Sequence, residues 1–164
     1  MKKILTAVLV FSLLAAGAAL ATAATDTKTL TINFAPAARA KLTLSAASIT
    51  FPDADPDTSP TVNAGPINVT SSVRTGSAAH PSLTVLTGGD LISGTDTIAI
   101  GNVSWTATGA GYVAGTMNKA TAQSAGSWTG SGSYAGVFTY ALVNSWSYAT
   151  GSYAATATYT LTAP

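Results

Sequence analysis

The sequence of 164 residues contains no cysteine, no glutamate and a single histidine, and only 8% of its residues are charged. Without cysteine, disulfides, thiol nucleophiles, Cys-ligated zinc and Cys-attached haem are excluded. The histidine, His80, precedes Pro81 in an expected turn. A Ser-His-Asp triad would need folding to bring Asp90 or Asp96 next to this histidine. No nucleophile elbow surrounds any serine. We therefore expect a protein that is not an enzyme and needs no cofactor.

The first 23 residues have the pattern of a secretory signal peptide. A basic start, "MKK", precedes the apolar residues 4–20, and "ATA" at residues 21–23 offers a small-residue cleavage site. The apolar run is shorter than the roughly 20 residues of a membrane-spanning helix, although an uncleaved anchor is the alternative. The predicted mature chain starts near Ala24 and has 141 residues (164 minus 23), which suits one secreted domain without membrane association.

Charge is scarce in this mature chain. Five lysines and arginines stand against six aspartates, so the net charge is −1 (5 minus 6). A protein that binds nucleic acid through phosphates needs a basic patch, and the sequence offers none. Nucleic acid is therefore excluded as a partner.

The mature chain is dominated by segments with a period of two residues, the pattern of β-strands. In "TLTINF", residues 29–34, Leu30, Ile32 and Phe34 share one face. Proline- and glycine-rich stretches such as "FPDADPDTSP" separate the segments. We predict an all-β fold, an antiparallel immunoglobulin-like β-sandwich of about 7–9 strands, with a small β-barrel as the alternative. The further strand candidates are residues 41–45, 48–51, 67–73, 82–87, 97–107, 136–143 and 152–162.

The C-terminal stretch, "GSYAATATYTLTAP", carries no charge, and Lys119 is the only charged residue after Asp96. Natural sheets usually protect their edges with charged residues or proline. Tyr153, Tyr159 and Leu161 would share one face of this strand and form part of the core. In the middle of a sheet such a strand is ordinary packing, whereas at an edge it is a template for a neighbour's strand.

The N-terminal residues 24–40 form a second candidate for strand pairing. Leu30, Ile32 and Phe34 precede "APAARA", a small-residue linker that contains a proline. This linker would let the strand leave its own domain, and we predict that the segment fills a groove in a neighbouring subunit.

Two further residue sets suggest ligand binding. Asp53, Asp55 and Asp57 alternate like the first ligands of a calcium site, but the glycine and the closing glutamate of an EF-hand loop are missing, which favours a solvated acidic loop. Trp128 and Trp146 follow serines in two similar stretches. Their rings either pack in the core or stack on a sugar.

The C-terminal stretch resembles the closing motif of WxL domains, surface modules that attach non-covalently to the wall of Gram-positive bacteria. Tyr153, the run Thr158-Tyr159-Thr160-Leu161 and Pro164 match that motif, with Tyr159 in place of the usual tryptophan. The upstream Trp-x-Leu signature is absent, since Trp105 is followed by Thr106 and Ala107. The strand pattern also resembles, through architecture alone, secreted pilin and spore-coat-like sandwiches that exchange strands.

These observations predict a secreted structural or adhesive protein of the bacterial cell surface or extracellular matrix. Its expected partner is another copy of itself, joined by strand pairing as in fimbriae, or a polymer of the cell envelope. The alternative is a glycan- or cell-wall-binding module that uses exposed tryptophan or tyrosine rings.

Overall fold

The computed structural model describes residues 24–164. The chain forms two units, one ending at Phe34 and one from Ala35 to Pro164. The predicted signal peptide, residues 1–23, lies outside the described residues. Within residues 24–164, no helix has the length and apolar character required to cross a membrane.

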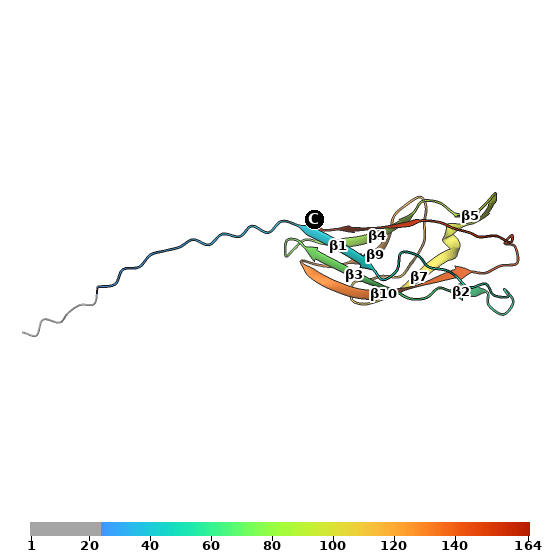
Figure 1. Cartoon of the computed structure of the whole chain (residues 1–164), viewed down its shortest axis with the longest axis horizontal. Coiled ribbons are helices and arrows are strands. Elements are labelled where there is room, and N and C mark those ends of the chain that lie inside the picture. The colour runs from blue at the N-terminus through green and yellow to red at the C-terminus, as the bar shows by residue number, and fades with distance from the viewer. Residues whose placement is uncertain (1–23) are drawn as a thin grey trace, which may run out of the picture. The chain divides into compact units, whose positions relative to one another are not determined.

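The unit from Ala35 to Pro164 consists of antiparallel sheets that pack face to face (Figure 1). The larger sheet has the strand order β1-β3-β10-β7-β8, and β2 pairs with the end of β10. The smaller sheet has the order β11-β4-β9, and β5 and β6 form a separate hairpin. The strands are β1 (Arg39–Leu44), β2 (Thr61–Asn63), β3 (Ile67–Arg74), β4 (Ser82–Thr87), β5 (Leu91–Ser93), β6 (Asp96–Ile98), β7 (Val103–Thr108), β8 (Gly115–Thr116), β9 (Gln123–Ser127), β10 (Gly132–Val143) and β11 (Ala157–Thr162).

Strand β10 is the central strand of the larger sheet. Its twelve residues span roughly 40 Å when extended. One edge pairs first with β3 and then with β2, while the other edge pairs with β7. In β3 next to it, buried Ile67 and Val69 alternate with Asn68 and Thr70, which point away from the core. The period of two in the sequence is therefore realised as one apolar and one polar face.

The core lies between the two larger sheets. Phe138 and Trp105 come from the larger sheet, Leu83 and Val85 come from the smaller sheet, and all four side chains are fully buried. The predicted all-β sandwich is confirmed, and the sheets do not close into a barrel. There are eleven strands because four of them, β2, β5, β6 and β8, have only two or three residues.

Three strand predictions within the unit from Ala35 to Pro164 differ from the structure. Residues 48–51 are not a strand, although Ile49 and Phe51 still pack against the core from a loop. The predicted strand 97–107 is divided by a 3-10 turn, Ile100–Asn102, where the carboxylate of Asp90 accepts the backbone N–H of Ile100. The closing strand begins only at Ala157, so Tyr153 precedes it.

Residues 24–34 form no regular secondary structure, so the strand predicted for residues 29–34 is wrong as a description of the single chain. No strand within residues 24–164 pairs with this segment. Its three large apolar side chains are almost fully exposed: Leu30 at 83%, Ile32 at 87% and Phe34 at 83%. An alternating segment needs a partner strand to bury such a face, and a single chain provides none here.

Candidate functional site

An open seam runs along one side of the sandwich, between β1 and β11. Each strand is the last of its sheet, and within residues 24–164 no strand pairs with the outer edge of either one. The two strands are close neighbours across the seam, but no hydrogen bond in the described part of the chain joins them. Figure 1 shows β1 and the C-terminal end of the chain at the same end of the sandwich.

On the opposite side of the sandwich, backbone hydrogen bonds join β9 to residues 111–113, just before β8. The N–H of Val113 donates to the carbonyl of Ala125 at 3.1 Å, and that of Ser127 donates to Gly111 at 2.8 Å. An isolated β-bridge also joins Tyr112 to Gly126. The sandwich is therefore sealed on one side and open on the other.

A groove of about 590 Å³ occupies the open seam. Half-buried Leu42, Leu44 and Tyr159 line it, and all three also pack against the core. The remaining lining is small: Ser45, Ala46, Ala47, Ala157 and Thr158. The groove thus exposes part of the hydrophobic core to solvent.

The backbone along the groove is oriented for strand addition. The N–H of Ser45 donates to the carbonyl of Asn68 in β3 of the larger sheet. Successive residues of a strand point their backbone N–H and C=O groups to opposite sides, so those of Leu42 and Leu44 point away from β3 and into the seam. On β11, the carbonyl of Thr156 accepts a bond from Gly88 of the smaller sheet, so the backbone groups of Tyr159 likewise point into the seam. Both edges therefore offer donors and acceptors to an added strand.

The groove is backed by a pair of tyrosines. The hydroxyl oxygens of Tyr140, on the larger sheet, and Tyr159, on the smaller sheet, are 2.6 Å apart, and the Tyr159 ring stacks on Phe138. Burial raises the pKa of both phenols, and for Tyr159 the neighbouring Tyr140 raises it further. Both hydroxyls therefore stay protonated at pH values above the usual phenol pKa, and the groove lining carries no charge.

Of the predicted core residues at the C-terminus, Tyr159 and Leu161 pack against the core, but Tyr153 does not. Tyr153 lies before β11, and its hydroxyl donates to the carbonyl of Ala149. Its assignment to the core strand is therefore wrong, because the chain joins the sheet only from Ala157 onwards.

The acidic loop uses its carboxylates in local hydrogen bonds. Asp55 accepts the backbone N–H of Asp57 at 2.9 Å, and Asp57 accepts the indole N–H of Trp146 at 3.0 Å. Asn144 donates to the carbonyls of Ala54 and Ser59 and ties the loop to the end of β10. Among residues 24–164, no three histidine or aspartate side chains, Asp53 included, gather in a way that could hold a metal ion.

The two candidate sugar-stacking tryptophans lie in opposite environments. Trp128 is 7% exposed, its indole N–H donates to Ala110, and its ring stacks on Tyr134. It is a core residue, so its assignment as a glycan contact is wrong. Trp146 is 69% exposed beside Asp57.

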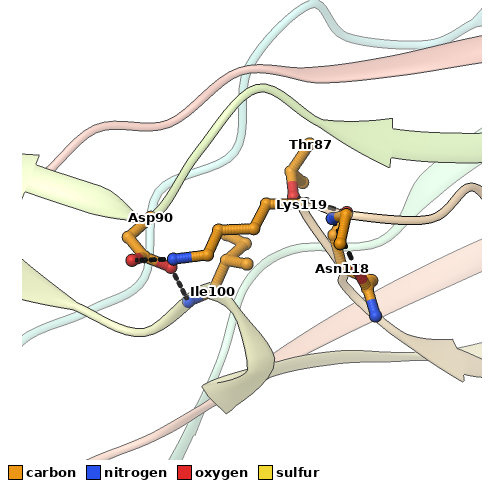
Figure 2. Close-up of polar contacts among 6 residues, drawn as sticks. Thr87, Asp90, Ile100, Asn118 and Lys119 are labelled. Atoms are coloured by element: carbon orange, nitrogen blue, oxygen red, sulfur yellow. Dashed lines mark hydrogen bonds and ion pairs between the residues drawn. The ribbon is translucent and has the colours of Figure 1, made fainter.

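His80 and Asp90, which were considered for catalysis, each interact with other residues and not with one another. His80 is exposed, and its ring nitrogen lies 3.4 Å from the hydroxyl of Thr129. Asp90 pairs instead with Lys119 at 2.5 Å and accepts the N–H of Ile100, as Figure 2 shows. The hydrogen bond from Lys119, supported by the one from Ile100, lowers the pKa of Asp90, so the carboxylate is fixed as an ionised structural group.

Sequence reasoning identified Tyr159 but missed Leu42, Leu44 and Tyr140 as parts of the same site. Leu42 and Leu44 were visible as the apolar face of a strand, yet nothing in that pattern says which strand is last in its sheet. No family model, curated protein or solved structure matches this chain.

Proposed function

We propose that the protein is a secreted, non-enzymatic structural subunit of the cell surface or extracellular matrix that assembles with copies of itself by strand donation. The observation that carries the proposal is the open seam: β1 and β11 leave a groove that exposes Leu42, Leu44 and Tyr159. Long exposed edges of this kind favour association, and here neither proline nor charge interrupts the groove lining.

The chain also carries a segment suited to such a groove. Leu30, Ile32 and Phe34 alternate in sequence, are exposed, and are flanked by no regular structure within residues 24–38. Strand addition supplies affinity through the main chain and specificity through alternate side chains. Each fully buried side chain of this size contributes about 1.5–3 kcal/mol, so three of them support a stable contact.

The test compares two matched triple variants of the mature chain, residues 24–164. Leu30→Ser, Ile32→Ser and Phe34→Ser together should leave a folded monomer, because the core lies entirely outside this segment. Thr29→Ser, Thr31→Ser and Asn33→Ser, on the other face, should assemble like the wild type. Size-exclusion chromatography and electron microscopy report assembly, and circular dichroism reports folding. Wild-type assembly by the apolar-face variant would rule out strand donation.

Secretion is part of the proposal and has its own measurement. The basic start and the small residues 21–23 predict export with cleavage before Ala24. Terminal sequencing of the exported protein should give a start at Ala24 or within a few residues of it. Recovery of the exported protein with Met1 at its N-terminus would contradict the prediction.

The second candidate function is binding of a glycan or a cell-wall polymer, as the resemblance to WxL domains implies. The exposed indole of Trp146, held by Asp57, favours it, since exposed aromatic rings stack on sugars. A monomeric mature protein that sediments with purified cell walls, and a Trp146→Ala variant that does not, would support this function over assembly. Trp128→Ala is no control here, because it removes a core side chain.

A further inference from the structure

The groove lies towards one end of the sandwich. Its lining comes from the second half of β1 and the residues that follow, Leu42 to Ala47, and from the first half of β11, Ala157 to Tyr159. The other end holds the start of β1 and the end of the chain. There, Arg74 donates to the carbonyl of Ala37, and the hydroxyl of Thr75 donates to the carbonyl of Pro164. We call the end of the groove at Ser45–Ala47 the mouth.

The candidate donor segment is attached to the opposite end of the sandwich from the mouth. It continues into β1 at Arg39, and only residues 35–38 separate it from that strand. Four residues span at most about 14 Å. The six residues of β1 span about 20 Å, so this linker cannot carry Phe34 along the length of a groove.

We infer that residues 28–34 of one copy occupy the β1/β11 groove of the next copy, entering at its mouth and running parallel to β1 and antiparallel to β11. This inference rests on the proposed function and adds the occupant, its direction and its register. Because the linker is short, Phe34 stays near the mouth of the acceptor, beside Ala46. Ile32 and then Leu30 lie progressively deeper, towards the acceptor's own Arg39.

The chemistry of the two surfaces agrees with this direction. Residues 30–34 are about 17 Å of extended chain, which fits the lining from Leu42 to Ala47, while residues 28 and 29 continue beyond the lining along β1. The groove is uncharged and apolar, with half-buried Leu42, Leu44 and Tyr159, while the polar face of the donor would turn Thr31 and Asn33 towards solvent. The backbone groups of Leu42, Leu44 and Tyr159 that point into the seam would pair with the added strand.

The direction determines the symmetry of the assembly. One end of each copy donates and the opposite end accepts, so the contact is heterologous and leaves a free donor and a free mouth at the ends of every oligomer. Such contacts produce open chains, or rings where the rotation between copies closes, rather than symmetric pairs. A segment that instead folded back into its own groove would run antiparallel to β1, with Phe34 far from the mouth.

Cysteine cross-linking tests the inference in a chain that has no cysteine of its own. The mature double variant Asn33→Cys with Ser45→Cys places one thiol beside Phe34 and the other at the mouth. With Phe34 beside Ala46, Asn33 lies beside Ser45 on the same, solvent-facing side of the sheet, and a disulfide requires Cα atoms about 4.4–6.8 Å apart, so the inferred register brings these two positions together. Oxidation should give a ladder of dimers, trimers and longer species on non-reducing gels, which a reductant collapses to the monomer.

The matched control is Asn33→Cys with Ala135→Cys, where Ala135 is an exposed residue of β10 outside the groove lining. It should give no ladder, and equal ladders from both variants would indicate random collision and overturn the inference.

A third variant, Thr27→Cys with Ala46→Cys, detects folding back of the segment into its own groove as a disulfide within the monomer, which would also overturn the inference. If the wild type assembles but Asn33→Cys with Ser45→Cys forms no ladder, the inferred register is wrong, while assembly itself is retained. If the wild type stays monomeric at every concentration, the proposed function itself fails.

Discussion

Tyr140 and Tyr159 connect the two sheets of the sandwich through hydroxyl oxygens that are 2.6 Å apart. Tyr140 is on the central strand of the larger sheet, and Tyr159 is on the edge strand that borders the groove. This hydrogen bond crosses the core next to the open seam, so it holds the groove wall in place without a charge.

Replacing one of these tyrosines should destabilise the fold. Tyr159→Phe leaves the Tyr140 hydroxyl buried without its partner, which costs about 1–3 kcal/mol of unfolding free energy. The double variant with Tyr140→Phe should cost less than the sum of the single variants, since no polar group is stranded. Urea unfolding measures all three. Tyr134→Phe is the control, because its hydroxyl makes only a 3.5 Å contact. A loss for Tyr134→Phe as large as for Tyr159→Phe would contradict the assignment.

Stability should fall in alkali. The pKa values of Tyr140 and Tyr159 are raised in the folded protein, mainly by burial, above the unfolded value of about 10. Their contribution is complete below about pH 10 and is lost as the pH rises further, because the unfolded chain releases these protons first. Melting temperatures from pH 8 to 11.5 should show this fall, and the double Phe variant should show a shallower one. Identical slopes would mean that other groups cause it.

The C-terminal strand should be indispensable. Deletion of residues 153–164 removes β11, its pairing with β4, and the core contacts of Tyr159 and Leu161. Total stability is about 5–15 kcal/mol, so the loss of a whole edge strand should unfold the domain. Deletion of Ala163 and Pro164 alone leaves β11 intact and serves as the control. Circular dichroism separates the two variants of the mature chain, and a folded product of residues 24–152 would contradict the prediction.

Gly111 should not tolerate a side chain. Its φ is +83°, and a Cβ atom would enter the indole of Trp128. Gly111→Ala should therefore cost about 2 kcal/mol or more, from strain and from a displaced core ring. Gly101→Ala is the matched control, because nothing lies within 4 Å of the added Cβ. Equal melting temperatures for the two variants would show that Trp128 can move without cost.

Calcium should leave the stability unchanged. The carboxylates of Asp55 and Asp57 accept hydrogen bonds from the loop backbone and from Trp146. Within residues 24–164 they belong to no group of three side chains that could hold a metal ion. Melting curves with calcium and with a chelator should therefore coincide. A rise of several degrees with calcium would show that Asp53, Asp55 and Asp57 form a metal site.

The sequence by itself determined the fold class and much of the strand composition. Residues 67–73 and 82–87 were predicted as strands, and the structure confirms both. Apolar residues at every second position lie on one face of a strand, and that face becomes buried when the strand is part of a sheet. It also determined that the N-terminal segment has an apolar face, which Leu30, Ile32 and Phe34 carry.

The tertiary structure decided which strands are last in their sheets and where the seam opens. The period of two is the same for an edge strand and a central one, so it does not identify β1 and β11 as edges; Arg39 and Lys41 in β1 are the one signal of an edge, and uncharged β11 carries none. The same holds for Trp128 and Trp146, which follow similar sequences but differ in burial. Burial depends on what the fold places opposite a side chain, and for Trp128 this is Tyr112 and Tyr134, which come from other parts of the chain.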